Sequence, residues 1–337
     1  RRYAHRRIRR TRLQGLSADG RVTAEKIERL RRRADLVGRA RRFFEARGVM
    51  EVDTPLLADG VVVEAHIDPI PCEVRVGGGA AVKRRLLTSP EGPMKRLLAQ
   101  GSGPIYQFAH AFRDGEMGRR HAVEFTMLEW YRPGLDHIEL MSEVEALVQE
   151  LIPETGGARF DRVTYRELFR EFASIDPFET SVGAIGERCA ALGVDVPQGF
   201  GDGTIDDALD LILVSHIEPT LAAERPLFVH GYPPSQAALA QVRAPTDEQP
   251  ATADRFELYL RGVELANGYH ELIDADEQRH RFEEANRARV ASGRAALPID
   301  DALLDALRDG FPPCAGVALG FDRLLMLALG LDRIGDV

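Results

Sequence analysis

Two apolar runs joined by a short charged loop constrain the fold of this chain most strongly. PIYQFAHAFR at 104–113 and VEFTMLEWYR at 123–132 flank the loop DGEMGRRHA. Runs rich in aromatic and aliphatic residues on either side of a polar loop predict two neighbouring strands. Side chains alternate across a strand, so one face of the second strand carries Phe125, Met127, Glu129 and Tyr131.

The rest of the chain alternates between helical and strand patterns. Helical spacing predicts a helix from about 23 to 47 that ends at Gly48, further helices over 137–152 and 274–293, and a mostly helical region over 160–225. Strands are predicted around 50–54, in a hairpin over 72–88, over 225–233 and 253–268, and at 316–320 before an apolar helix. Such an order indicates an α+β fold, an antiparallel sheet flanked by helices.

Composition excludes several classes of protein. The three cysteines, Cys72, Cys189 and Cys314, lie far apart without a CxxC pair, so they indicate neither a zinc site nor a disulfide framework. No run of 18 uncharged apolar residues occurs, which argues against a membrane-spanning segment. A globular enzyme of the reducing cytoplasm fits this composition best.

Positive charge is concentrated at the start of the chain. Residues 1–47 contain 17 Lys and Arg against 5 Asp and Glu, whereas the remainder contains 27 against 48. The acidic body repels a phosphate backbone, while the leader over 1–22 has three interpretations: a solvated helix face, a transit peptide or a grip for RNA. We expect a catalytic domain over 23–337. The chain lacks a starting methionine and stops soon after an apolar helix, so we expect a fragment with a truncated C-terminal end.

Two arginines lie at positions suited to phosphate binding. Arg113 ends an apolar strand, and its guanidinium fork matches phosphate oxygens; the alternative is an internal salt bridge to Glu116 or Glu129. Arg323 falls in the first turn of the last helix, after Gly320, where free backbone N–H groups favour anions; the alternative is an ordinary strand-to-helix turn with a surface arginine.

Two glutamates offer ligands for a metal ion. Glu264 and Glu271 lie seven residues apart, which would place them on opposite faces of a regular strand. We expect Asn267-Gly268 to form a turn or bulge that brings both carboxylates to one side. Mg²⁺ is commonly held by one or two carboxylates together with substrate phosphates. The alternative is a hairpin with two exposed glutamates.

These pieces, in this order, resemble the three motifs of class II aminoacyl-tRNA synthetases. ARGVMEVDTPLL resembles motif 1, FRDGEMGRRHAVEFTMLEW motif 2 and GVALGFDRLLML motif 3, whereas the class I signatures HIGH and KMSKS are absent. TSPEGPMKRLL and ELANGYHELIDADEQRHRF resemble the lysine-specific branch. In that family motif 1 builds the dimer interface, which implies a homodimer through the Gly48–Pro55 region.

Within the branch, the chain is similar to the truncated paralogues that modify translation elongation factor P. Lysyl-tRNA synthetases carry an anticodon-binding domain ahead of motif 1, but only 47 residues precede Gly48 here. The resemblance implies ATP- and Mg²⁺-dependent activation of (R)-β-lysine, or lysine, as an adenylate. The acceptor would be a lysine of elongation factor P, with tRNA not expected as a substrate. Two alternatives stay open: lysyl transfer to tRNA or another acceptor, and a non-catalytic regulatory subunit.

The resemblance also implies roles for individual residues. Arg113, Arg323, Glu264 and Glu271 would be catalytic, and the two glutamates would hold Mg²⁺. Implied contacts to the substrate amino acid come from Ser89, Pro90, Glu91, Tyr131, Glu271 and Ala318, with Ser89 and Ala318 associated with acceptance of β-lysine. The implied ATP contacts come from Arg113, Asp114, Gly115, Glu116, His121, Phe125, Glu264, Leu265, Gly320 and Arg323.

Motif 2 departs from the family in two places. The family commonly has Arg-Asn-Glu where this chain has Arg113-Asp114-Gly115, so the acidic contact to adenine is either shifted to Glu116 or lost. It also commonly has His-Asn-Pro where this chain has His121-Ala122-Val123. Both departures bear on nucleotide affinity.

Overall fold

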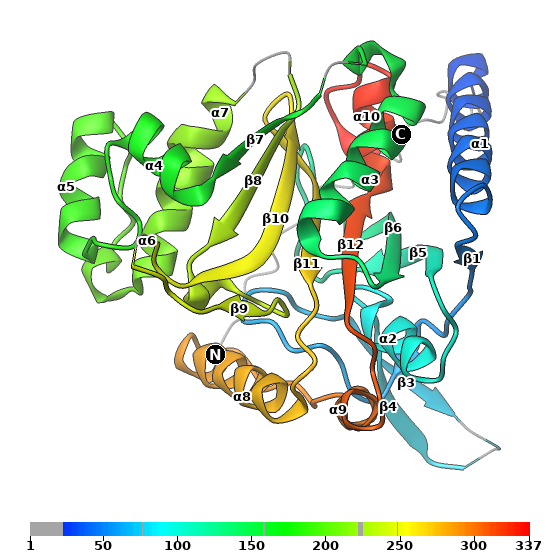
Figure 1. The fold of residues 1–337 in the computed structure, drawn as a ribbon. Helices are drawn as coiled ribbons and strands as arrows, with labels where there is room; N and C mark the ends of the chain where they lie inside the picture. The colour runs from blue at the N-terminus through cyan, green and yellow to red at the C-terminus, as the bar shows by residue number, and fades with distance from the viewer. Residues whose placement is uncertain (1–22, 76, 78, 158, 222–224, 248) are drawn as a thin grey trace, which may run out of the picture.

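A nine-stranded sheet forms the centre of the protein (Figure 1). The computed structural model describes residues 23–337 except 76, 78, 158, 222–224 and 248, so the basic leader lies outside the described residues. From one edge, the strand order is β1 (Met50–Glu51), β5 (Ile105–Phe112), β6 (Glu124–Pro133), β12 (Cys314–Gly320), β11 (Val263–His270), β10 (Thr252–Leu260), β8 (Leu227–Tyr232) and β7 (Asp161–Thr164), with β9 (Val242–Arg243) beside β10.

Most neighbouring strands are antiparallel, which confirms the predicted α+β class. The exceptions lie at the edges, where β1 pairs with β5 and β7 pairs with β8 in parallel. The predicted strand pair at 104–132 is formed by β5 and β6, with Ile105 opposite Tyr131 and Phe112 opposite Glu124. The aromatic and aliphatic runs on either side of the charged loop therefore lie at the centre of the fold.

One face of the sheet is covered by α1 (Ala24–Glu45), α3 (His137–Leu151) and α10 (Phe321–Ala328). Phe44 of α1, Leu140 of α3 and Leu324 of α10 join Leu128 and Trp130 of β6 in one buried cluster. Burial of these side chains supplies the main driving force for folding. The predicted first helix is confirmed, since Thr23 caps its N-terminus and Gly48, at φ +65°, follows it.

The remaining helices form two further groups. At the left of Figure 1, α4 (Tyr165–Ala173), α5 (Val182–Leu192), α6 (Ile205–Ile212) and α7 (Glu218–Thr220) gather beside β8. At the bottom, α9 (Asp301–Arg308) contacts α8 (Ala275–Ala291) and α2 (Glu91–Ala99), and the small sheet of β2 (Leu57–Ala58), β4 (Ala81–Leu86) and β3 (Pro71–Arg75) lies at the lower right. The shorter helical turns are η1 (Pro153–Thr155), η2 (Phe200–Asp202), η3 (Leu213–Ile217), η4 (Pro234–Gln236) and η5 (Ile334–Asp336).

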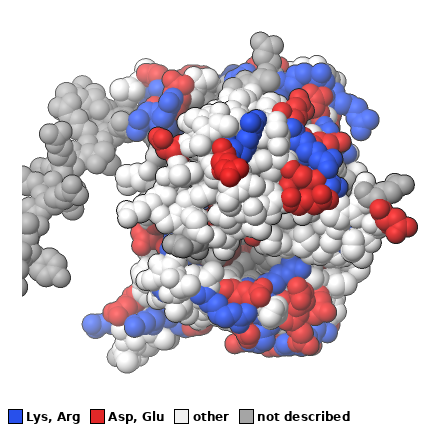
Figure 2. All heavy atoms as spheres, turned by 90° about the vertical axis from the view of Figure 1, so that its left-hand side faces the viewer, with Lys and Arg blue, Asp and Glu red and all other residues white. Residues whose placement is uncertain are grey.

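Charges of both signs mix on the face shown in Figure 2, where blue and red atoms lie next to one another. In α4, Arg166 and Arg170 both contact Asp176 at 2.6 Å. Positive charge that is paired in this way offers little attraction to a phosphate backbone. No helix of the described residues combines the length and the apolar sequence needed to span a bilayer.

Candidate active site

The cavity that contains the predicted site lies on the sheet face opposite α3 and has a volume of about 330 Å³. The predicted face of β6 is confirmed, because Phe125, Met127, Glu129 and Tyr131 all line this cavity. Leu128 and Trp130, between them, point into the core beneath α1 and α3. The alternation of side chains along a strand thus separates a chemical face from a packing face.

A bulge at Leu265 brings Glu264 and Glu271 to the same cavity. Leu258 of β10 pairs with Ala266, but the next residue, Tyr259, pairs with Glu264, so Leu265 is an extra residue in β11. The prediction of a turn or bulge at Asn267-Gly268 is wrong in its position, because both residues lie within the regular ladder and the bulge is at Leu265.

Gly268 is needed for close packing and not for a turn. A Cβ atom there would meet the ring of Phe256 at 2.4 Å, so the glycine is required by close packing between strands. The bulge, not the glycine, therefore changes the direction in which Glu264 points.

One end of the cavity is suited to an anion. The Nε atom of Arg113 is buried without a hydrogen-bond partner among the described residues, and its guanidinium approaches Glu116 only at 3.8 Å. The same guanidinium lies 5.2 Å from the ring of Phe125. A buried donor without a partner destabilises the protein by about 1–3 kcal/mol unless a ligand accepts from it. The arrangement fits a phosphate beside an aromatic ring.

Arg323 reaches the same end from α10. Its Nη1 donates to the backbone oxygen of Glu264 at 2.9 Å and lies 3.3 Å from the carboxylate Oε2 of the same residue, while Nε donates to the Arg120 oxygen at 3.1 Å. Burial and the nearby charge of Glu257 raise the pKa of Glu264, although Arg323 opposes the shift. A divalent cation bound between like-charged carboxylates reduces their repulsion. The carboxylates of Glu257 and Glu264 therefore suit Mg²⁺.

The other end of the cavity is acidic. Glu129 is 2 % exposed and accepts hydrogen bonds from the Tyr131 hydroxyl at 2.6 Å and from the Ser89 hydroxyl at 2.7 Å. Burial, together with the charge of Glu91, raises the pKa of Glu129 to about 8. The carboxylate is therefore expected to ionise fully only when a cation comes to meet it.

Lys95 joins two further carboxylates beneath this end. Its ammonium lies 2.5 Å from Glu91 Oε1, one helical turn earlier, and 2.6 Å from Glu271 Oε2. Burial raises the pKa of Glu271 to about 7, even though Lys95 acts in the opposite direction. Among the described residues, Lys95 is the one ammonium that contacts this group of carboxylates, so a second cation would balance the remaining charge of Glu91, Glu129 and Glu271.

The structure brings together most of the residues predicted from the sequence. The cavity is lined by Ser89, Glu91, Arg113, Glu116, His121, Phe125, Tyr131, Glu264, Leu265, Glu271, Ala318, Gly320 and Arg323. Pro90, Asp114 and Gly115 do not line it: Pro90 is the N-cap residue before α2, Asp114 donates its backbone N–H to the Asp68 oxygen, and Gly115 adopts a φ of +78° in the loop. Glu116, rather than Asp114 or Gly115, is thus the acid of this loop that faces the cavity.

Several residues of the site were not predicted. Lys95 lies four residues after Glu91, a spacing that brings two side chains together on a helix, and this signal was available in the sequence. Arg255 and Glu257 also line the cavity, and Glu257 accepts hydrogen bonds from the hydroxyls of Tyr232 at 2.8 Å and Tyr259 at 2.6 Å. Their role depends on which strands pair, which local patterns do not reveal.

Comparison with known proteins identifies a matching family and several similar proteins. Residues 9–337 match the family described as tRNA synthetases class II (D, K and N). A protein of Proteus mirabilis (strain HI4320), named elongation factor P–(R)-β-lysine ligase, is 46 % identical over 313 residues, 92 % of this chain and 94 % of its own length. Proteins with the same name from Vibrio vulnificus (strain YJ016) and Salmonella arizonae are 46 % identical over 325 residues and 44 % identical over 312. The alignments cover 96 % and 92 % of this chain, and 98 % and 94 % of the respective relatives.

Proposed function

The chain belongs to the class II tRNA synthetases (D, K and N), and we propose that it activates (R)-β-lysine with ATP and attaches it to a lysine of translation elongation factor P. The names of its relatives, at 44–46 % identity over nearly the whole chain, carry this proposal. The cavity supports it, since its basic end suits ATP and its acidic end suits an amino acid with two ammonium groups.

In the first step, the substrate carboxylate attacks the α-phosphorus of ATP. A bond forms between the carboxylate oxygen and phosphorus, the bond to the bridging oxygen breaks, and pyrophosphate leaves. A carboxyl with a pKa of about 4 is already ionised at neutral pH, so no base is needed. Arg113 and Arg323 bind and orient the phosphates and neutralise their charge.

Mg²⁺ would be held by Glu264 at the basic end and would supply further neutralisation of the phosphates, whereas Glu271, the other predicted ligand, lies at the acidic end beside Lys95. In the second step, the acceptor amine attacks the acyl carbon, an amide forms and AMP leaves. The amine, with a pKa of about 10.4, must lose its proton before it attacks. The reaction therefore belongs to the AMP-forming ligases.

The acidic end would bind the ammonium groups of the amino acid. Glu129 and Glu271 have raised pKa values because they are buried, and an arriving ammonium stabilises their ionised forms. Ser89 and Ala318 line the same cavity, consistent with their implied part in accepting β-lysine. We infer that (R)-β-lysine is preferred to L-α-lysine.

We further propose that the protein is a cytoplasmic homodimer, with the Gly48–Pro55 segment at the interface. Met50, in the edge strand β1, is 50 % exposed, and Leu57 in β2 is 45 % exposed. Large apolar side chains exposed at a sheet edge are typical of surfaces that a partner covers.

The experiment that tests the proposal is amino-acid-dependent exchange of pyrophosphate into ATP, followed by transfer of labelled amino acid to purified elongation factor P. We expect exchange that favours (R)-β-lysine and label that passes to the protein. Arg113→Ala should abolish exchange, whereas Arg119→Ala should retain it, because Arg119 is an exposed arginine of the same loop that does not line the cavity. Transfer to tRNA instead of elongation factor P would contradict the proposed acceptor, and no exchange with either amino acid would favour a regulatory subunit.

A further inference from the structure

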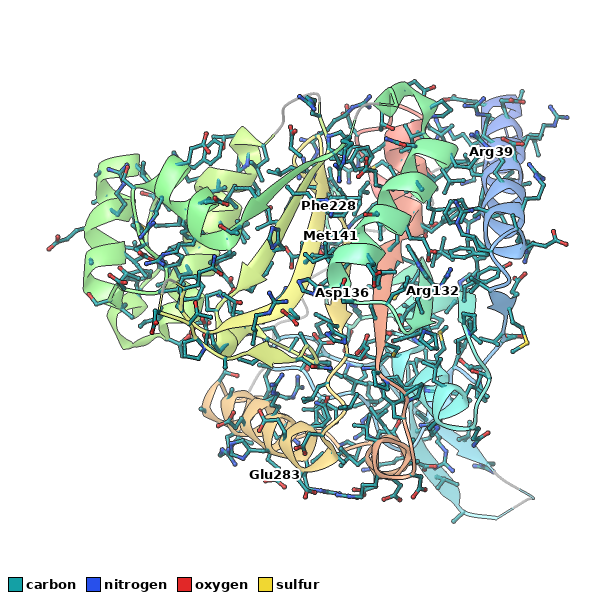
Figure 3. All side chains as sticks on the ribbon, in the orientation of Figure 1. Arg39, Arg132, Asp136, Met141, Phe228 and Glu283 are labelled. Atoms are coloured by element: carbon teal, nitrogen blue, oxygen red, sulfur yellow. The ribbon has the colours of Figure 1, made fainter. Side chains whose placement is uncertain are left out.

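A cluster of three potential metal ligands lies on the sheet face opposite the cavity. His137 is the first residue of α3, directly after Asp136, which is labelled in Figure 3 where α3 begins above the sheet. Asp254 of β10 and His270 of β11 come from adjacent antiparallel strands. One potential ligand atom from each of the three residues lies within 4.8 Å of the other two.

The cluster is separate from the site described above. His270 stands between Tyr269 and Glu271, which both line the cavity, so its side chain points to the other face of β11. Asp254 likewise precedes Arg255, which lines the cavity. A ligand held by these three residues would therefore not share the nucleotide site.

The spacing within the cluster is too long for hydrogen bonds. Asp254 Oδ1 lies 3.8 Å from His137 Nε2, and Asp254 Oδ2 lies 3.6 Å from His270 Nδ1. Ligand atoms bonded to a tetrahedral Zn²⁺ at roughly 2.0–2.1 Å are separated by about 3.4 Å. These two distances end on different oxygens of Asp254, and one ligand atom from each residue lies within 4.8 Å of the other two, so the side chains would have to close by up to about 1.4 Å around such an ion.

One ring nitrogen of His137 has no hydrogen-bond partner among the described residues. Its side chain is 4 % exposed, and Nδ1 is buried without a hydrogen-bond partner among the described residues. Buried polar groups in native structures are almost always satisfied, so an imidazole with one orphaned nitrogen and the other 3.8 Å from a carboxylate requires an explanation. A metal ion bound through Nε2 accounts for the nitrogen that faces Asp254, whereas Nδ1 stays without a hydrogen-bond partner among the described residues.

Arg243 is the competing cation for the carboxylate. Its Nη2 lies 3.0 Å from Asp254 Oδ1, but its side chain is 62 % exposed, so solvent screens the pair and the arginine can leave. This ion pair explains why Asp254 is tolerated in a buried position. It does not explain the two histidines that face it.

We propose that His137, Asp254 and His270 bind one divalent transition-metal ion, with Zn²⁺ as the fitting ion and water in the fourth position. Two imidazoles and one carboxylate favour Zn²⁺ over Mg²⁺ or Ca²⁺, which prefer oxygen ligands. The ion would fasten the start of α3 to the β10–β11 pair. The cysteine spacing gave no sign of this site because none of its ligands is a cysteine.

The test is zinc titration of the whole chain after chelator treatment, in buffer with excess Mg²⁺ so that magnesium sites stay filled. Isothermal titration calorimetry gives stoichiometry and affinity, and Co²⁺ absorption reports the ligand type. We expect one Zn²⁺ per chain and a nitrogen–oxygen cobalt spectrum without thiolate bands. His137→Gln should weaken binding by more than about 100-fold, since loss of outer-shell partners alone costs 10–100-fold.

Two further variants keep the test decisive. Arg243→Gln removes the competing cation from the surface and should tighten zinc binding. His280→Gln removes an exposed histidine of α8 and should leave binding unchanged. The proposal is overturned if neither the wild type nor Arg243→Gln binds zinc, if correctly folded His137→Gln, checked by circular dichroism, binds as the wild type does, or if cobalt shows thiolate ligation.

Discussion

Replacement of Lys95 by methionine tests whether the acidic end of the cavity depends on one buried cation. Lys95 is 1 % exposed, and its ammonium contacts Glu91 at 2.5 Å and Glu271 at 2.6 Å. Methionine fills similar volume but leaves both carboxylates without their cation. Removal of one partner from a buried ion pair destabilises a protein by about 3–5 kcal/mol. We therefore expect the free energy of unfolding of Lys95→Met to be lower than that of the wild type by this amount at about pH 8.

The loss should shrink as the pH falls. Burial raises the pKa of Glu271 to about 7, and the charge of Lys95 holds it below the value it would otherwise reach. In Lys95→Met the folded protein therefore binds a proton more tightly than the unfolded chain does, and its stability rises as the pH falls from the folded pKa towards the unfolded one. The wild-type Glu271 also takes up a proton below its pKa of about 7, so the loss relative to the wild type shrinks only above about pH 7, by up to about 1.4 kcal/mol for each pH unit and carboxyl group.

Urea unfolding of the wild type and the variant at about pH 8 and about pH 5.5 measures both effects. Arg96→Met is the matched control on the same helix, because Arg96 pairs with Asp300 at 2.7 Å but is 32 % exposed, and we expect a loss of about 1 kcal/mol. The reasoning is refuted if Lys95→Met loses no more stability than Arg96→Met, or loses the same amount at both pH values.

Three other predictions follow from the same geometry. Gly316→Ala would place a Cβ atom 2.3 Å from Glu271 Oε1, so we expect a KM for the amino acid at least about tenfold higher, measured by pyrophosphate exchange. Because burial raises the pKa of Glu271 to about 7 and that of Glu129 to about 8, the same KM should fall as the pH rises from about 6 to about 9; a KM that is constant or rises would contradict this. Met50→Asp should shift the protein towards monomers in analytical ultracentrifugation, whereas Val290→Asp, on exposed α8, should not.

The sequence predicted those parts of the site that depend on local periodicity. Alternation along β6 was enough to place Phe125, Glu129 and Tyr131 on one face, because the side chains of a regular strand have no other arrangement. The order of the three motifs then indicated which segments meet, and Arg113 and Arg323 do line one cavity. These predictions needed no knowledge of strand register.

The parts that were missed depend on contacts between distant segments. The bulge at Leu265 exists only in the pairing of β11 with β10, so nothing near Asn267-Gly268 distinguishes the wrong turn from the observed ladder. Lys95 could have been linked to Glu91 by helical spacing, but its contact with Glu271 requires α2 to lie beneath β11. Local patterns carry no information on such placements.

The raised pKa values of Glu129 and Glu271 have a consequence for how an amine substrate would bind. Without substrate, ionisation of both Glu129 and Glu271 would place two further negative charges beside Glu91 in a buried volume, with Lys95 as the nearby cation. Their raised pKa values mean that these carboxyl groups keep their protons instead. An arriving ammonium replaces those protons, so binding of the amino acid is coupled to proton release near neutral pH. The acidic end then selects substrates that carry positive charge. When the cavity is empty, its carboxyl groups are protonated, and a protonated carboxyl destabilises the protein far less than an unpaired buried carboxylate would.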